Sequence, residues 1–295
     1  MAATVYIIRH AEAEGNIYRR CHGLYDSLLT PRAYQQLPCL AKRFENVPLA
    51  AVYASPLFRA RTTAQAVAAP HGLTVELRND LHEIDMGDWE DLPWAELPHG
   101  WPDQYAKWCA RPWEAAPPHG ETVMQAGARM LNEVRRLAQE NDGKAIAVVT
   151  HGSAIRGALT IAHGFPPEKM NEIGWGDNTC VARLDFADDG SIDVVYENDA
   201  SHLPQELSTF ACIGWKNAKG IPVSPQIWFR RADPNNPQDV DKIVEFMREL
   251  HRNAYGTDEG LDPAALLRDV ERAQQVSRSE ERRVGKESRS RWSPY

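Results

Sequence analysis

The sequence predicts an α/β protein, a three-layer sandwich in which helices flank a mostly parallel central sheet. Two observations lead to this fold class. Short β-branched or apolar runs alternate with helical patterns over roughly the first 200 residues. The two best-defined runs, Val5 to Ile8 and Ala145 to Val149, are apolar throughout, which is typical of strands that helices cover on both faces.

The other elements follow the same alternation. Thr30 and Pro31 supply an N-cap and a first-turn proline for a helix that runs to about Phe44. The Ala- and Arg-rich stretch 57–68 has high helix propensity, and 121–140 is amphipathic. Further elements are a helix at 154–163, strands at 50–54 and 73–77, and a hairpin at 181–186 and 192–197. Loops are expected at 18–29 and 81–87, and the Trp-rich stretch 89–113 is expected to be irregular.

Composition and charge exclude several classes of protein. The 295-residue chain has ordinary hydrophobic and charged contents of 43% and 25%, and no apolar run approaches the roughly 20 residues of a membrane span. No secretory signal is recognisable, and a net charge of −8 without a basic stripe argues against nucleic-acid binding. Five scattered cysteines without a C-x-x-C pair fit a reducing cytosol and argue against disulfides or zinc. We therefore expect a cytoplasmic protein that binds neither membrane nor nucleic acid.

The α/β pattern ends near residue 205, so we expect a domain over residues 1–205 and a linker over 206–225. Residues 226–277 suggest a strand at 227–234 and helices at 239–251 and 263–275. They weakly resemble the start of a GCN5-type acetyltransferase domain, or else form a helical extension that packs on the first domain. Because no acetyl-CoA pyrophosphate loop follows, no acetyltransferase activity is expected. Residues 278–295 resemble a translated sequencing adapter and are expected to be an artefact, with a disordered basic tail as the alternative.

Basic residues stand where the two best-defined strands end. Arg9 and His10 follow the first, and His151 follows the second. In open α/β sheets ligands bind beyond the carboxyl ends of the strands, which can bring such residues together. Arg59 begins a helix directly after a strand, where it could bind an anion; the alternative is that Arg59 and Arg61 lie on a solvated helix face. A histidine beside an arginine at a strand end indicates phosphoryl chemistry, although a lone histidine is more often structural.

Seven short motifs, taken in order, resemble those of the histidine phosphatase superfamily, which includes the phosphoglycerate mutases. They are Arg9-His-Ala-Glu12 through Asn16, His22-Gly-Leu-Tyr-Asp-Ser-Leu-Leu-Thr30, Ser55-Pro-Leu-Phe-Arg-Ala60, Leu81-His-Glu-Ile-Asp-Met-Gly-Asp-Trp-Glu90, Gly120-Glu-Thr122, Thr150-His-Gly152 and Gly176-Asp-Asn178. The resemblance covers residues 4 to about 203. Ala11 and Ala33 depart from it, since glycine is commoner at both positions, and no loss of activity is expected from either.

The resemblance implies a role for eight residues. His10 is the nucleophile that forms a phosphohistidine, and Glu83 protonates the leaving group and then activates water. The residues that bind the phosphoryl oxygens are Arg9, Asn16, Arg59 and His151. His22 and Gly23 line the substrate mouth. Covalent catalysis divides one hard displacement into two easier ones, and fixed cations meet the phosphoryl charge. No cofactor or metal is implied, and no cluster of His, Asp and Glu has metal-binding spacing.

Hydrolysis is expected rather than phosphotransfer. Mutases of the superfamily carry a longer insert after the acid, whereas here residues 87–94 lead directly into the Trp-rich segment, as in the broad-specificity and ribazole-phosphatase branch. The expected function is that of a metal-independent phosphomonoesterase acting on a small phosphorylated metabolite. The alternatives are a cofactor-dependent mutase and a non-catalytic relative that binds phosphoesters or a protein partner. The tryptophans either pack in the interior or contact the substrate's organic part.

Overall fold

The computed structural model describes residues 3–213, 236–242, 244–245 and 248. The chain divides into two compact units, residues 1–229 and 230–295, and each is considered by itself. In the second unit the described residues 237–242, 244–245 and 248 are helical, in agreement with the helix expected from residue 239. The strand expected at 227–234, the helix at 263–275 and the tail 278–295 lie outside the described residues. None of the helices within the described ranges has the length and apolarity needed to span a membrane.

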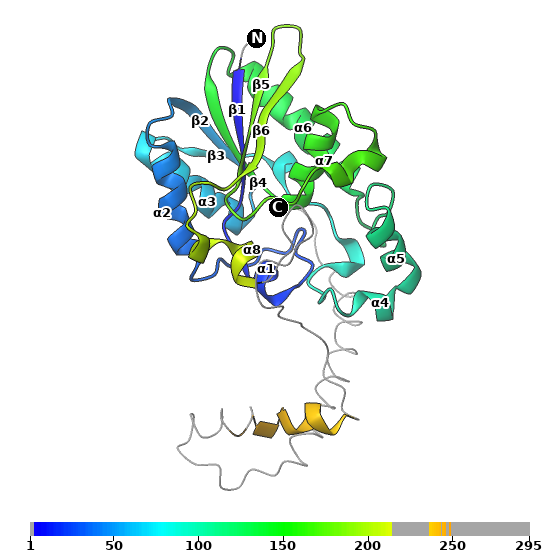
Figure 1. Ribbon diagram of the computed structural model, residues 1–295. Helices are drawn as coiled ribbons and strands as arrows, with labels where there is room; N and C mark the ends of the chain where they lie inside the picture. Colours follow the sequence, from blue (N-terminus) through cyan, green and yellow to red (C-terminus); the bar gives the residue numbers. More distant parts are fainter. Residues whose placement is uncertain (1–2, 214–235, 243, 246–247, 249–295) are drawn as a thin grey trace, which may run out of the picture. The chain divides into compact units, whose positions relative to one another are not determined.

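The first unit is built on one six-stranded sheet with the order β3-β2-β4-β1-β5-β6 (Figure 1). Four strands are parallel: β1 (Ala3–Arg9), β2 (Leu49–Ala54), β3 (Val75–Leu77) and β4 (Ala145–Thr150). The antiparallel hairpin of β5 (Val181–Phe186) and β6 (Ile192–Asp199) completes one edge. The predicted sandwich with a mostly parallel sheet is therefore confirmed.

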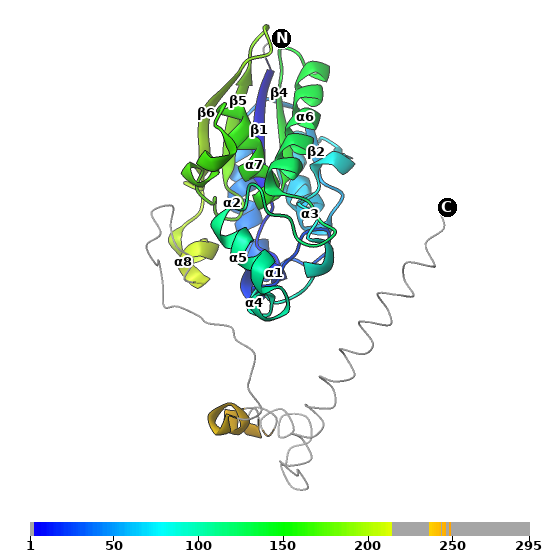
Figure 2. The ribbon, with the colours of Figure 1, turned by 90° about the vertical axis from the view of Figure 1, so that its right-hand side faces the viewer.

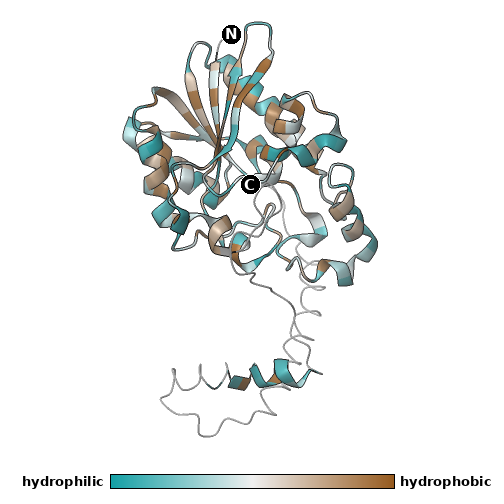
Figure 3. Ribbon diagram, viewed as in Figure 1, coloured by the Kyte–Doolittle hydropathy of each residue, from teal (hydrophilic) through white to brown (hydrophobic). Residues whose placement is uncertain are grey.

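Two pairs of helices cover the two faces of the sheet (Figures 1 and 2). Helices α2 (Ala33–Phe44) and α3 (Phe58–Ala68) lie on one face, and α6 (Val123–Glu140) and α7 (Gly152–Ala162) on the other. Consecutive residues of β1 point to opposite faces, so Ile7 packs in the core under α6 and α7 and Ile8 in the core under α2 and α3. Figure 3 shows hydrophobic residues along the strands between these helices.

Four short helices are grouped near the carboxyl ends of the parallel strands. The short helices are α1 (Glu14–Tyr18), α4 (Leu97–Gly100), α5 (Pro102–Ala110) and α8 (Thr209–Ile213), and Figure 1 shows them together. The 3₁₀ turns are η1 (Ala69–His71), η2 (Asn79–Leu81), η3 (Gly87–Trp89), η4 (Pro167–Glu172) and η5 (Gln205–Leu207). The segment 89–113 was therefore wrongly predicted to be irregular, because α4 and α5 lie within it. Its Trp89 is fully buried and packs against Trp101 and Trp108.

The helix expected from Thr30 begins at Ala33, because the intervening residues form a turn. The hydroxyl of Thr30 still accepts a hydrogen bond from the Ala33 N–H at 3.2 Å, and it donates to the Glu12 carboxylate at 2.7 Å. Thr30 therefore caps the turn and also anchors the segment that follows β1.

The first unit continues past the expected domain boundary at residue 205. The Gln36 side chain donates to the carbonyl oxygen of Leu207 at 2.8 Å and to the Thr209 hydroxyl at 3.2 Å. Thr209 is buried and donates to the Glu12 carboxylate at 2.8 Å, and Ser208 donates to Asp177 at 2.5 Å. Residues 206–213, expected to begin a linker, are therefore part of the domain. We name residues 207–209 the exit segment.

Helices α6 and α7 approach closely because each has a glycine at their crossing. A Cβ placed on Gly127 would lie 2.3 Å from the backbone of Gly157, and one on Gly157 would lie 2.3 Å from the carbonyl oxygen of Val123. Real Cβ atoms do not approach that closely, so any larger residue must push the helices apart.

We expect Gly127→Ala to lower the free energy of unfolding by about 2 kcal/mol, since overpacking outweighs the better helix propensity of alanine. The melting temperature should fall by roughly 5 °C. Gly100→Ala is the matched control, because nothing lies within 4 Å of its added Cβ. Equal melting temperatures for both variants would show that the crossing tolerates a methyl group.

Candidate active site

The carboxyl ends of β1 and β4 place two histidines side by side. Arg9 and Thr150 stand opposite each other as the last residues of these neighbouring parallel strands. His10 and His151 follow them, and their ring centroids lie 5.2 Å apart. The expectation that the sheet end brings these distant residues together is confirmed.

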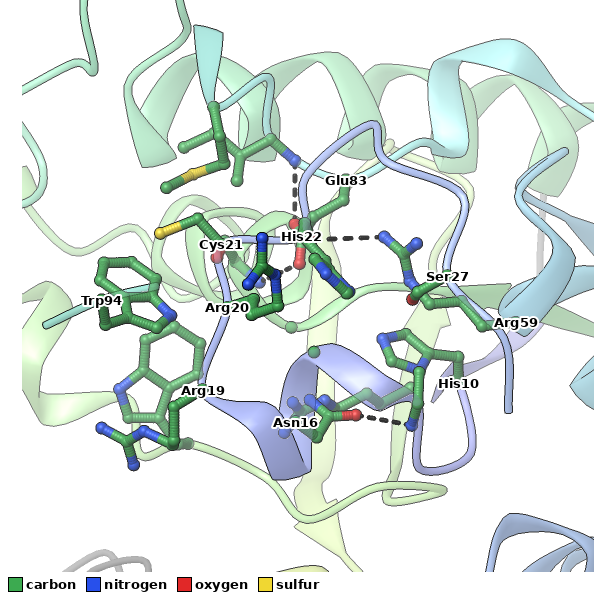
Figure 4. A pocket seen from close by; sticks show the side chains of 18 of the residues that line it. His10, Asn16, Arg19, Arg20, Cys21, His22, Ser27, Arg59, Glu83 and Trp94 are labelled. Carbon is green, nitrogen blue, oxygen red and sulfur yellow. Dashed lines mark hydrogen bonds between the residues drawn. The ribbon is translucent and has the colours of Figure 1, made fainter. Parts of the chain in front are cut away.

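A cavity of about 180 Å³ opens at this end of the sheet. Six of the eight predicted site residues line it: Arg9, His10, Asn16, His22, Arg59 and Glu83. His151 and Gly23 are buried but do not line it. Figure 4 shows His10 and Arg59 at one end of the cavity and Trp94 and Arg19 at the other. The cavity thus has an inner end near the sheet and an outer end at the tryptophans.

Hydrogen bonding and burial fix the protonation state of His10. Its Nδ1 lies 2.7 Å from the carbonyl oxygen of Ala11, and a carbonyl can only accept. Nδ1 therefore carries the proton in the neutral ring, and Nε2 keeps its lone pair. Burial, followed by the positive charges of Arg59 and Arg9, holds the pKa of His10 well below its usual range. The imidazole is neutral at pH 7, which is the form that can attack phosphorus.

His151 is also held neutral. Its Nε2 lies 2.8 Å from the hydroxyl of Ser55, and its buried Nδ1 has no hydrogen-bond partner within the described residues. Burial, then the charge of Arg59 and the neighbouring His10, holds the pKa of His151 well below its usual range. His151 therefore carries no positive charge at pH 7.

Arg59 is buried at the start of α3. Its side chain donates to the carbonyl oxygens of Gly23 and Tyr25 at 2.7 Å each. Burial lowers the pKa of Arg59 to about 10, so the guanidinium remains charged at pH 7. Arg61 is exposed on the same helix, so the solvated-face alternative holds for Arg61 and is wrong for Arg59.

Arg9 and Asn16 complete the inner end of the cavity. Arg9 is buried and donates to the carbonyl oxygen of Gly176 at 2.5 Å. The side-chain oxygen of Asn16 accepts from the Ala13 N–H at 2.9 Å and from the Asn178 amide at 3.2 Å. With its oxygen occupied, Asn16 has its amide nitrogen left as a donor for a ligand in the cavity.

Glu83 binds the amino end of α7. Its Oε1 accepts from the N–H groups of Ile84 and Ala154 at 2.9 Å, and its Oε2 accepts from the Ser153 N–H at 3.1 Å. These bonds satisfy two of the free amides of the helix terminus. They also fix the orientation of a carboxyl group that lines the same cavity as His10.

One carboxylate that sequence reasoning left without a role holds the loop at the cavity mouth. Glu90 accepts from the N–H groups of residues 23–25 at 2.7 to 3.2 Å and from that of Met86 at 3.0 Å. Arg59 binds the carbonyl oxygens of the same loop, so the loop is held from both sides. The sequence signal for Glu90 was its place at the end of the Leu81–Glu90 motif, which did not indicate this contact.

His22 lines the cavity and is held there by Asp91. Its Nε2 is 3.0 Å from the Asp91 carboxylate, which also accepts from Arg20 at 2.6 Å. Asp91 has a φ of 57°, a left-handed conformation that few non-glycine residues adopt. A Cβ on Gly15 would lie 2.3 Å from Nδ1 of His22, so the imidazole fits only against a glycine. Neither Arg20 nor Asp91 was identified from the sequence.

Tryptophans form the outer end of the cavity. Trp94 and Trp108 line it, with ring centroids 6.3 Å apart. The edge-on contact of Trp108 with the buried Trp89 fixes its position. Packing in the interior is therefore confirmed for Trp89, and contact of Trp94 and Trp108 with a substrate stays a prediction.

The buried neutral histidines predict a pH-dependent stability. His10 and His151 have pKa values below that of an unfolded histidine, so the unfolded chain binds more protons as the pH falls through about 6.5. Their contribution to stability is complete above that pH and is lost progressively below it. We expect a lower melting temperature at about pH 5.5 than at about pH 7.5. His10→Gln, which removes one of these groups, should show a weaker dependence, and a melting temperature independent of pH would contradict the assignment.

Comparison with known proteins agrees with this geometry. A family model described as the histidine phosphatase superfamily (branch 1) matches residues 5–199. The structure of Bacillus stearothermophilus YhfR superposes with a TM-score of 0.65 at 30% identity, covering 68% of this chain and 99% of that one. The uncharacterized phosphatase PhoE of Bacillus subtilis is 26% identical over 185 residues, 63% of this chain and 89% of PhoE. The adenosylcobalamin/alpha-ribazole phosphatase of Escherichia coli is 29% identical over 166 residues, 56% of this chain and 82% of that protein.

The fold and the residues gathered at the end of its sheet define an enzyme of the phosphatase class. The chain belongs to the histidine phosphatase superfamily.

Proposed function

We propose that this enzyme is a metal-independent phosphomonoesterase that works through a phosphohistidine on His10. The observation that carries the proposal is the state of His10. It is buried and neutral, its Nε2 is unprotonated, and two buried arginines line the same cavity. A neutral nucleophile among fixed cations suits a dianionic phosphate ester, whose charge the cations attract and neutralise.

In the first step, Nε2 of His10 attacks phosphorus and the bond from phosphorus to the ester oxygen breaks. Arg9 and Arg59 bind the phosphoryl oxygens as charge moves onto them, and Asn16 and His151 add hydrogen bonds. Glu83, protonated at this stage, gives its proton to the leaving oxygen, so that the alcohol departs neutral. Its hydrogen bonds to the amino end of α7 keep the carboxyl group in the cavity.

In the second step, water attacks the phosphohistidine. The carboxylate of Glu83 takes the proton from water while the nitrogen–phosphorus bond breaks, which releases inorganic phosphate and restores neutral His10. Glu83 is protonated at the end of the cycle as it was at the start, so the enzyme is ready for the next substrate.

The substrate that fits is a small phosphorylated metabolite whose organic part reaches the outer end of the cavity. The relative from Escherichia coli is named as an adenosylcobalamin/alpha-ribazole phosphatase, and this name supports the substrate class. The wall formed by Trp94 and Trp108 offers an apolar surface to that organic part. His22 lies between the two ends and contacts the substrate near the ester.

The test uses the full chain and p-nitrophenyl phosphate, with and without EDTA, beside a mutase assay on 3-phosphoglycerate. We expect hydrolysis that EDTA does not change. Loss of activity in EDTA would overturn metal independence, and mutase turnover without comparable hydrolysis would make the enzyme a phosphotransferase. A folded protein inactive across a panel of phosphomonoesters would contradict the phosphatase proposal and favour a binding function.

A further inference from the structure

A residue with a strained backbone, Thr179, is hydrogen-bonded to the backbone of His10. Thr179 has a φ of 62°, in the left-handed region, and is fully buried. A β-branched residue in that conformation is a genuine outlier, because its side chain crowds its own backbone. Such strain persists only where surrounding contacts enforce it.

The turn that contains Thr179 holds the backbone of His10. The Thr179 N–H donates to the carbonyl oxygen of His10 at 3.3 Å, and the Asn178 side chain donates to the same oxygen at 3.0 Å. Asn178 also donates to Asn16 at 3.2 Å, and the carbonyl oxygen of Cys180 accepts from Arg9 N–H at 3.0 Å. The conformation of this turn therefore sets the position of three residues of the inner cavity.

His202 holds the Thr179 side chain. Its Nε2 lies 3.0 Å from the Thr179 hydroxyl, and its Nδ1 lies 3.1 Å from a guanidinium nitrogen of Arg43. A guanidinium can only donate, so Nδ1 must accept and Nε2 must carry the proton. His202 therefore donates a hydrogen bond to the Thr179 hydroxyl.

Arg43 fixes this arrangement from α2. It donates to the Asp199 carboxylate at 2.6 Å and to the Asp199 carbonyl oxygen at 3.1 Å, and its guanidinium lies 5.7 Å from the centroid of the Tyr196 ring. Burial and the charge of Arg43 lower the pKa of His202 to about 4, so its single donor hydrogen stays on Nε2 at neutral pH. A chain of contacts thus runs from α2 through His202 and Thr179 to the nucleophile.

We propose that His202 is a positioning residue for the nucleophile: it holds Thr179 in the left-handed conformation that presses the 177–180 turn against the carbonyl oxygen of His10. The inference rests on the proposed role of His10. The inference predicts that a substitution of His202 lowers kcat only where the residue at position 179 disfavours the left-handed conformation. Glycine adopts it without strain, so a glycine at position 179 removes the need for His202.

The experiment is a double-mutant cycle of His202→Ala and Thr179→Gly in the full chain, with His202→Gln and His163→Ala beside it. A misplaced nucleophile costs on the order of 10- to 100-fold in kcat, which is the loss expected for His202→Ala with Thr179 present. In the Thr179→Gly background the same substitution should cost less than about threefold, since the strain is gone. His202→Gln should recover most of kcat, because one amide can accept from Arg43 and donate to Thr179. His163, exposed and paired with Glu197, should be silent.

Two results would overturn the inference. One is a lowered melting temperature for His202→Ala with kcat unchanged, which would make His202 merely structural. The other is an equal loss of kcat with threonine and with glycine at position 179. The imidazole ¹⁵N resonances of His10 provide a readout that needs no turnover: they should shift in His202→Ala and shift less in the double variant. If the wild-type enzyme had no phosphatase activity, the proposed function would be wrong. The ¹⁵N resonances of His10 would still test whether His202 positions that residue.

Discussion

His10→Ala should reduce kcat for p-nitrophenyl phosphate by on the order of 10⁴-fold or more, because the variant has no group that can form the covalent intermediate. The imidazole is buried, keeps a free lone pair on Nε2 and lines the same cavity as Arg9 and Arg59. The effect should appear in kcat, since the cations that bind the phosphoryl group remain. The melting temperature should stay close to that of the wild type, which would show that the loss of kcat does not come from unfolding.

The covalent intermediate gives an independent measurement. Wild-type enzyme quenched in alkali during turnover should carry a phosphoryl group that is stable in base and lost in acid, as a phosphohistidine is. The label should be absent from His10→Ala and present in His99→Ala, which removes an exposed histidine of α4. Label retained in His10→Ala would identify another nucleophile.

Arg59→Lys should reduce kcat/KM by on the order of 10²-fold, although the charge is conserved. A lysine offers one point of charge where the guanidinium offers a planar fork, and it leaves the carbonyl oxygens of Gly23 and Tyr25 without their donor. Binding of the phosphoryl group should weaken, and the loop of residues 23–25 should be held less firmly. Inhibition by inorganic phosphate should weaken in parallel.

Arg61→Lys is the matched control for this substitution. It makes the same chemical change two residues along the same helix, on a side chain that is exposed and does not line the cavity. Its kcat/KM should stay within about twofold of wild type, as exposed positions usually do. If Arg59→Lys also stayed within that range, Arg59 would be a structural arginine that only holds the loop.

The sequence was most informative where the signal is local. Apolar runs marked β1 and β4, and basic residues at their ends marked the site, because a strand end is visible in a few consecutive residues. The motif order added Glu83 and Asn16, which no local pattern would have singled out. The start of α2 was misplaced by the side chain of Thr30, which caps a turn rather than the helix itself.

The supporting contacts could not be predicted, because they join residues far apart in the chain. Glu90 reaches a loop some 65 residues earlier, and Asn178 and Thr179 reach the backbone of His10 from the opposite end of the domain. Nothing in the residues around Thr179 indicates a left-handed backbone, since threonine there is unfavourable. The conformation follows from His202 and Arg43, and only the folded chain brings these together.

The exit segment, residues 207–209, determines where the first domain can be cut from the rest of the chain. Its hydrogen bonds to Glu12 and Asp177 attach the end of the domain to the loops that carry His10 and Asn178, and its hydrogen bonds to Gln36 attach it to α2. A stop codon or protease site at residue 205 would remove residues 207–209, and the loops that carry His10 and Asn178 would lose these hydrogen bonds. A fusion joint or protease site placed after residue 213 leaves these hydrogen bonds intact.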